Sequence, residues 1–277
     1  HDTECPPGPD RTMDRSRGAA VGADWRTSHL VHFPAGDTCL NAAQQGRFMR
    51  PHGRNLGCID KKITKVVALS TDKASNPINL YGATKLASDK LFVAASSIDQ
   101  EHNTQFSVVR YGNVMGSRGS VIPFFLNKKA EGILPITDPR MTRFMISLEE
   151  GVKLVWHAFE DMLGGEIYVK KIPSMTITDI AKAVSPEAKQ KIIGIRPGEK
   201  LHEQMIGIED APHTYEYEEH FKILPAIHNW SKDPNRIKDG QAVSDDFMYS
   251  SDNNKEWMNA EDLSLWIKEN EHKIGLI

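Results

Sequence analysis

Residues 65–85, KVVALSTDKASNPINLYGATK, hold the pattern that decides the fold. The first part, Lys65 to Ser70, is a short run rich in apolar and β-branched side chains, which predicts a buried strand. A helix is predicted from Tyr81 to about Ser97. The polar side chains between these elements follow the strand end, where ligands bind in open α/β sheets. The segment therefore predicts a strand–helix unit with a site between its two elements.

Strands and helices continue to alternate along the rest of the chain. Ser147 and Glu150 form an S-x-x-E capping box, which predicts the start of a helix that runs through Phe159. The other predicted elements are strands at Phe106–Tyr111 and Glu166–Lys170, a helix capped by Thr178 that runs through Ala183, and an amphipathic helix at Glu261–Glu269. This alternation predicts an α/β fold with a Rossmann-like, doubly wound parallel sheet and a smaller C-terminal substrate lobe.

Residues 1–57 differ sharply in composition from the rest. They contain seven arginines and no lysine, isoleucine or tyrosine, whereas residues 58–277 contain six arginines and twenty-one lysines. The segment shows no sustained strand or helix period and includes Pro6-Pro7-Gly8-Pro9, which predicts loop or disorder. We expect either a truncated or frame-shifted upstream region, in agreement with a histidine as first residue, or a natural disordered extension.

The predicted α/β domain accordingly spans residues 58–277 and is incomplete at its N-terminal half, where a first βαβ portion is missing. Parallel sheets normally have both faces covered by helices. Without that first portion, one side of the strand at Val66 is expected to be open.

The composition excludes several kinds of partner. The formal net charge of −3 gives no electrostatic case for binding nucleic acid or a membrane surface. The sequence contains no apolar run of roughly eighteen residues, so no membrane span is expected. Cys5, Cys39 and Cys58 fit no zinc spacing, so no metal site is expected. The absence of a secretory apolar segment favours the cytoplasm.

Two pairs of titratable side chains follow the predicted strand. Tyr81 and Lys85 are four residues apart and share one helix face, where a lysine ammonium lowers the pKa of a phenol and makes it a usable general base. The alternative is a solvated pair, which this spacing also gives on many helices. Asp72 and Lys73 form the second pair, for which the alternative is an exposed loop pair. An acid and a base beside a tyrosine–lysine pair match an oxidation followed by an elimination.

The stretch STDKASNPINLYGATKLASDKLF at 70–92 closely resembles the inverting UDP-N-acetylglucosamine 4,6-dehydratases. These belong to the extended short-chain dehydrogenase/reductase family and begin pseudaminic acid biosynthesis. Retaining dehydratases of this group carry Asp-Glu in place of Asp72-Lys73, or methionine in place of Tyr81, so both positions favour the inverting subclass. The likeness covers about residues 58–277 and continues in RYGNVMGSRGSVIP at 110–123, ITD at 136–138, MTRF at 141–144, GIRPGEKLHE at 194–203 and YSSDNN at 249–254.

The resemblance implies catalytic roles at the strand end. Tyr81, with Lys85 beneath it, would take the proton of the sugar 4-hydroxyl while NADP+ accepts hydride from carbon 4. Thr71 would hydrogen-bond that hydroxyl. Lys73, kept neutral by a neighbouring cation, would remove the proton on carbon 5, and Asp72 would protonate the leaving 6-hydroxyl. Hydride would return to carbon 6, and reprotonation from the opposite face would invert carbon 5.

The resemblance also implies binding residues. Tyr81, Lys85 and Val114 are expected at the NADP. Backbone N–H groups at a glycine before a helix suit phosphate, arginine suits phosphate, and glutamate suits ribose hydroxyls. The UDP-sugar is expected at Asn113, Arg118, Gly119, Ser120, Val121, Ile122, Arg143, Arg196 and Glu199. The family further suggests a homo-oligomer.

One family motif is missing from the sequence. The turn T-G-G-T-G-S-F-G, which cradles the NADP pyrophosphate, does not occur, and Gly18-Ala19-Ala20-Val21-Gly22 lacks the required spacing. We therefore expect this chain to bind NADP poorly and to be a weak or inactive dehydratase. Two other functions stay open: a nucleotide-sugar 4-epimerase, which needs no elimination base, and a non-catalytic fragment or pseudo-enzyme that only folds or associates.

Overall fold

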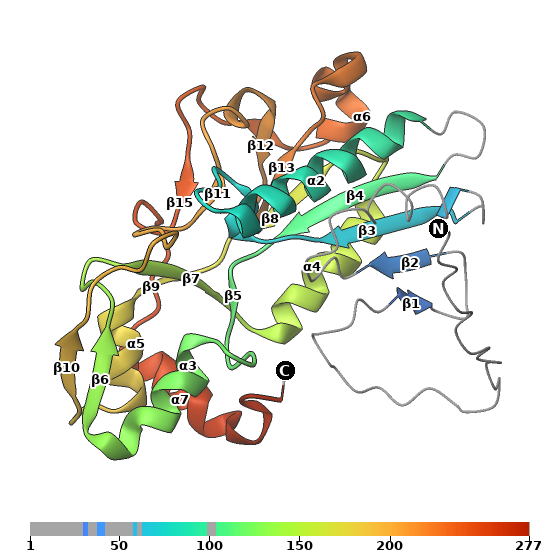
Figure 1. Cartoon of the computed structure of the whole chain (residues 1–277). Coiled ribbons are helices and arrows are strands. Elements are labelled where there is room, and N and C mark those ends of the chain that lie inside the picture. The colour runs from blue at the N-terminus through green and yellow to red at the C-terminus, as the bar shows by residue number, and fades with distance from the viewer. Residues whose placement is uncertain (1–29, 33–37, 42–57, 60–62, 99–103, 277) are drawn as a thin grey trace, which may run out of the picture.

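A computed structural model describes residues 30–32, 38–41, 58–59, 63–98 and 104–276. The strands of its largest sheet are β1 (Leu30–His32), β2 (Thr38–Asn41), β3 (Lys65–Leu69), β4 (Gln105–Arg110), β8 (Ile167–Lys170), β12 (Thr214–Glu216), β13 (His220–Ile223) and β14 (Gln241–Ala242). Their order is β1-β2-β3-β4-β8-β13-β12-β14 (Figure 1). The four strands β2, β3, β4 and β8 pair in parallel with one another, and the other pairs are antiparallel.

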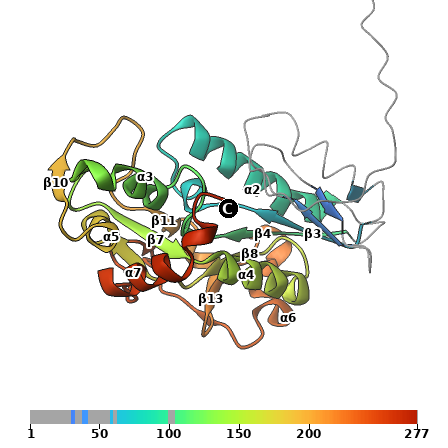
Figure 2. The same ribbon diagram turned by 90° about the horizontal axis from the view of Figure 1, so that it is seen from below.

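The central strand β3 is buried on both faces because helices cover the sheet from either side. Val66 packs in one hydrophobic cluster with Phe92 of α2 (Leu80–Ile98). Val67 points to the other face and packs in a second cluster with Leu154 of α4 (Leu148–Asp161). Figure 2 shows α2 and α4 on opposite sides of the parallel strands. This arrangement confirms the predicted Rossmann-like, doubly wound class.

A smaller lobe with its own core lies on the side toward which β3 and β4 point (Figure 1). It draws on the middle of the chain as well as on the C-terminal part. Its main elements are α3 (Val121–Lys128), β6 (Ile133–Ile136), α5 (Ile177–Val184), β10 (Lys189–Ile192) and α7 (Ala260–Glu269).

Short elements connect the sheet and the lobe. Two small sheets consist of β5 (Asn113–Val114), β7 (Thr142–Ile146) and β9 (Ser174–Thr176), and of β11 (Gln204–Ile206) and β15 (Tyr249–Ser250). The remaining helical turns are α6 (Pro234–Ile237), η1 (Asp72–Ala74), η2 (Lys129–Glu131), η3 (Ala211–His213), η4 (Ile227–Lys232) and η5 (Glu271–Lys273).

The two predicted helix caps had different outcomes. The capping box is confirmed, because Ser147 Oγ accepts the Glu150 N–H and the Glu150 carboxylate accepts the Ser147 N–H. The prediction that Thr178 caps the next helix is wrong. Thr176 caps α5 by accepting the Asp179 N–H at 3.1 Å, because its hydroxyl stands three residues before that N–H.

The expectation of an open side at the strand with Val66 is also wrong. β2 (Thr38–Asn41) pairs in parallel with β3 there, and it contains no proline that would remove a backbone donor from the ladder. Both β1 and β2 fall within residues 1–57, for which loop or disorder was predicted. Most of that segment lies outside the described residues, so its origin and the boundary at residue 58 stay predictions.

Candidate active site

Thr71, Asp72 and Lys73 lie directly after β3, at its carboxyl end. The Thr71 hydroxyl caps η1 by accepting the Lys73 N–H at 3.4 Å. Asp72 is completely buried, and its Oδ1 accepts hydrogen bonds from Thr71 Oγ1 at 2.7 Å and from Lys73 Nζ at 3.0 Å. Its Oδ2 is buried without a hydrogen-bond partner among the described residues. The three residues thus form a connected cluster around a buried carboxylate, rather than an exposed loop pair.

Glu203, the residue before β11, extends this cluster into a row of alternating charges. Its Oε1 lies 3.5 Å from Lys73 Nζ and 3.8 Å from Arg143 Nε. Burial disfavours the charged form of Lys73, but Asp72 and Glu203 outweigh that effect and raise the pKa of the amino group above its ordinary value. The expectation that a neighbouring cation keeps Lys73 neutral is therefore wrong for this structure.

Tyr81 and Lys85 share one face of α2, as their spacing predicts. Tyr81 is half exposed, Lys85 is buried, and Lys85 Nζ lies 5.8 Å from the centroid of the tyrosine ring. Burial raises the pKa of Tyr81, the Lys73 ammonium opposes this rise, and Asp72 adds to it. The expected lowering of the phenol pKa by Lys85 is wrong, because the lysine lies over the ring and Lys73 is the cation that favours the phenolate.

The predicted diphosphate-binding turn lies between β5 and α3. Gly119 has a φ of +75°, which glycine adopts without strain. Asn113 Oδ1 and the Ser120 Oγ at the start of α3 are buried without hydrogen-bond partners in the described part of the chain. Arg118 is exposed, with Nε 3.4 Å from the Gly275 carbonyl oxygen. Buried polar atoms without partners, beside an exposed guanidinium, suit a polar ligand.

The first residues of α3 can reach such a ligand mainly through their backbone. Ile122 is buried in the core of the smaller lobe, and Val121 packs against that core. Val114 of β5 packs against the core of the main sheet. These side chains hold the turn in place.

The other predicted binding residues differ in how available they are. Arg196 is exposed, and its Nη1 lies 3.9 Å from Glu199 Oε1. The Arg143 guanidinium is largely engaged, because it donates to the backbone carbonyls of Thr142, Lys200 and Leu201. The structure therefore brings Arg143 to the Lys73 cluster through Glu203 and leaves the Arg196–Glu199 pair at the surface.

Sequence reasoning missed two charged groups near the site. Glu203 stands within a motif of the resemblance, but nothing in its spacing links it to Lys73. Arg110 and Asp89 form a buried ion pair with Nε and Oδ2 2.9 Å apart, which ties β4 to α2. A signal existed for the second group, since Arg110 and Asp89 are charged residues on predicted buried elements, and buried charges need partners.

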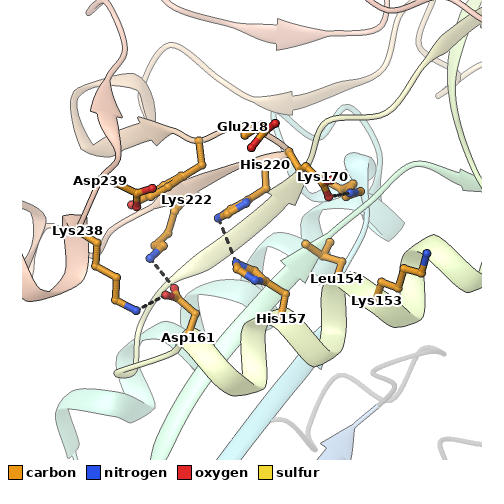
Figure 3. Close-up of a pocket in the computed structure, with 12 residues that line it drawn as sticks. Lys153, Leu154, His157, Asp161, Lys170, Glu218, His220, Lys222, Lys238 and Asp239 are labelled. Atoms are coloured by element: carbon orange, nitrogen blue, oxygen red, sulfur yellow. Dashed lines mark hydrogen bonds and ion pairs between the residues drawn. The ribbon is translucent and has the colours of Figure 1, made fainter.

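A cavity of about 340 Å³ lies elsewhere, between α4 and β13 (Figure 3). None of the predicted site residues lines it. His157 Nε2 and His220 Nε2 are 3.3 Å apart, and Asp161 pairs with Lys222 and Lys238. The Asp161 carboxylate at the end of α4 thus forms an ionic contact with Lys222 of β13 and with Lys238 after α6, which fastens α4 to the antiparallel strands.

Two further properties concern the described residues only. They contain no group of three or more His, Cys, Asp or Glu side chains arranged to hold a metal ion. None of their helices has the length and apolar character that crossing a bilayer requires.

The fold and the site together define a Rossmann-like α/β protein with a charged cluster and a tyrosine–lysine helix at the carboxyl edge of its parallel strands. The chain belongs to the family described as "Polysaccharide biosynthesis protein", whose model matches residues 55–225.

Several known proteins are similar to this chain. Two from Campylobacter jejuni, both named UDP-N-acetylglucosamine 4,6-dehydratase (inverting), are 57% and 56% identical over 213 residues, which is 74% of this chain. The chain spans 64% of the length of these curated relatives. A UDP-glucose 4-epimerase from Rickettsia conorii is 44% identical over 60% of this chain and 50% of its own length. The X-ray structure of Pen from Bacillus thuringiensis has a TM-score of 0.70 and 30% identity, over 82% of this chain and 67% of that one.

Proposed function

We propose that this chain carries the elimination site of an inverting UDP-N-acetylglucosamine 4,6-dehydratase that works with NADP in the cytoplasm. The observation that carries the proposal is the buried Asp72 with Lys73 Nζ 3.0 Å from its Oδ1. The names of the Campylobacter jejuni relatives support the same activity. An epimerase has no need of an acid–base pair here, so the pair favours a dehydratase.

Asp72 and Lys73 can supply the acid and the base together. Transfer of one proton along the hydrogen bond between Lys73 Nζ and Asp72 Oδ1 converts the ion pair into a neutral amine and a carboxylic acid. The amine then takes the proton from carbon 5, and the acid gives its proton to the leaving 6-hydroxyl, which departs as water. Lys73 is again an ammonium and Asp72 a carboxylate, so the observed ion pair is restored and the protons balance.

The other residues bind and orient. Tyr81, half exposed beside this pair, takes the proton of the 4-hydroxyl in its phenolate form, which the Lys73 ammonium favours. The unpartnered Oδ2 of Asp72 is available to a substrate hydroxyl. Thr71, whose hydroxyl donates to Asp72 Oδ1, fixes that carboxylate in addition to any contact with the sugar. Asn113, Arg118 and the start of α3 hold the diphosphate.

The residues present fit only part of a nicotinamide cofactor. The half-exposed Tyr81 and the buried Lys85, whose Nζ lies 5.8 Å from the centroid of the tyrosine ring, suit the nicotinamide end. A bound nicotinamide would accept a hydride from carbon 4 of the sugar and return it to carbon 6. No glycine-rich turn of the family form occurs in the sequence for the pyrophosphate end. Weak NADP binding and low activity are therefore part of the proposal.

The test is incubation of UDP-N-acetylglucosamine with stoichiometric amounts of the full chain and NADP+ in heavy water. The expected product is lighter by one water, carries deuterium on carbon 5 and has that carbon inverted. Lys73→Met should abolish it, because the base is lost. A 4-epimer would instead identify an epimerase. Calorimetry with UDP and with NADP+ in which neither binds would identify a non-catalytic fragment, and either outcome overturns the proposal.

A further inference from the structure

Two segments far apart in the sequence meet at three successive points around the candidate base. The Gly198 carbonyl oxygen accepts a hydrogen bond from Asn79 Nδ2 at 2.7 Å. Lys200 Nζ donates to the Ser75 carbonyl at 2.7 Å. Glu203 Oε1 lies 3.5 Å from Lys73 Nζ. The segment 198–203 therefore follows the stretch 73–79 and ends with its carboxylate at the lysine.

The backbone of Glu203 is held on both sides by Ser251. Ser251 Oγ accepts the Glu203 N–H at 2.9 Å, and the Ser251 N–H donates to the Glu203 carbonyl at 2.8 Å. Both Glu203 and Ser251 are buried. A buried carboxylate on this fixed backbone, with Oε1 3.5 Å from Lys73 Nζ, restricts where the flexible four-carbon side chain of Lys73 can place its amino group.

The two oxygens of the Glu203 carboxylate differ in their contacts. Oε1 faces Lys73 and Arg143, while Oε2 is buried with no hydrogen-bond partner among the residues that the structure describes. Leaving a buried carboxylate oxygen unpaired costs free energy. Packing alone does not account for a charged residue at this position.

We propose that Glu203 is a positioning residue, whose carboxylate holds the Lys73 amino group beside Asp72 and also faces the Arg143 guanidinium. The proposal rests on the proposed function in taking Lys73 as the base of the elimination. It assigns Glu203 no contact with substrate.

The charges around Lys73 predict the direction in which its pKa should change when a neighbour is replaced. Asp72 and Glu203 favour its ammonium form and raise its pKa against the opposing effect of burial, and Arg143 lowers it. Lys200 and Tyr81 also face the amino group. Removing the charge of Glu203 should therefore lower the pKa of Lys73, and removing that of Arg143 should raise it.

The experiment measures how fast Lys73 is acetylated by acetic anhydride across the range from about pH 7 to 11, with peptide mass spectrometry as the readout. The side chain of Lys73 is 38% exposed, so the reagent can reach it. In Glu203→Gln the curve of Lys73 labelling rate against pH should shift to lower pH by about half a unit or more. This corresponds to a roughly three-fold rise in the reactivity of Lys73 at fixed pH. Arg143→Met should move it up. Glu209→Gln, an exposed match six residues along the chain, should leave it unchanged.

Opposite shifts separate positioning from a general loss of structure, which would move both variants the same way. If Glu203→Gln does not fold, Arg143→Met still tests the charge row. Coincident curves for wild type and the folded variants, or shifts of the same sign, overturn the proposal. Labelling needs neither substrate nor cofactor, so opposite shifts without dehydration would uphold Glu203 and refute the proposed function. Dehydration together with coincident labelling curves would uphold the proposed function and refute the role of Glu203.

Discussion

Breaking the buried ion pair between Asp89 and Arg110 by removing one partner should destabilise the fold strongly. Both side chains are almost inaccessible, at 2% and 1% exposure, and Arg110 also reaches the Met205 carbonyl at 3.0 Å and Asp210 Oδ2 at 3.2 Å. Asp89→Ala leaves a buried guanidinium without its nearest carboxylate. Removing one partner of a buried pair costs about 3–5 kcal/mol, and the two remaining acceptors of Arg110 favour the lower end, about 3 kcal/mol. Domains of this size should then melt roughly 6–12 °C lower.

The assay is urea unfolding of the full chain, followed by circular dichroism. Glu131→Ala is the matched control, because it removes one partner of the exposed pair with Lys128 at 2.7 Å, and should cost about 0.5 kcal/mol or less. Replacing Asp89 by Leu and Arg110 by Met together should recover part of the loss, since the buried guanidinium and its nearest carboxylate are then removed together. If Asp89→Ala costs no more than Glu131→Ala, the argument from burial is refuted.

Two other substitutions test the close packing at Gly82 and the effect of the His220 pKa on stability. Gly82→Ala should destabilise the chain by about 1–3 kcal/mol in urea, because its Cβ would stand 2.5 Å from the Lys73 carbonyl oxygen; an unchanged midpoint would contradict this. Burial, and then His157, lower the pKa of His220 to about 4, below its ordinary value near 6.5. As pH falls between these values the unfolded chain takes up a proton and the folded chain does not, so stability declines there. His220→Phe should lessen that decline between about pH 6.5 and 4 in unfolding experiments, and an equal decline in both proteins would contradict it.

The sequence predicted the main α/β unit because its signals are local. Lys65–Leu69 is a strand, α2 begins one residue before Tyr81, and the closing helix runs from Ala260 to Glu269. Apolar periodicity and caps within a few residues carry this information. The wrong cap at Thr178 shows the limit, since two threonines stand two positions apart and only the backbone geometry selects Thr176.

The site was only partly predictable, because its electrostatics depend on residues far away in the chain. The sequence placed Asp72 and Lys73 after the end of a strand and Tyr81 at the start of the following helix, and the structure agrees. It could not show that Glu203, 130 positions after Lys73, approaches the same amino group at 3.5 Å. The pKa expectation for Lys73 was wrong in sign because Asp72 and Glu203 together outweigh the effect of burial. The expectation for Tyr81 was wrong because burial raises its pKa, and burial follows from tertiary packing.

The raised pKa of Lys73 is nevertheless compatible with the proposed role of this residue as a base. A lysine that had to lose its proton to water would be mostly inert near neutral pH. Here the proton only has to cross the 3.0 Å hydrogen bond to Asp72, with no change in the net charge of the site. A buried ion pair gains Coulomb energy but pays for the desolvation of both ions. A substrate that excludes water from the exposed side of Lys73 increases that desolvation cost and so favours the neutral pair, which makes the base and the acid available when the sugar is bound.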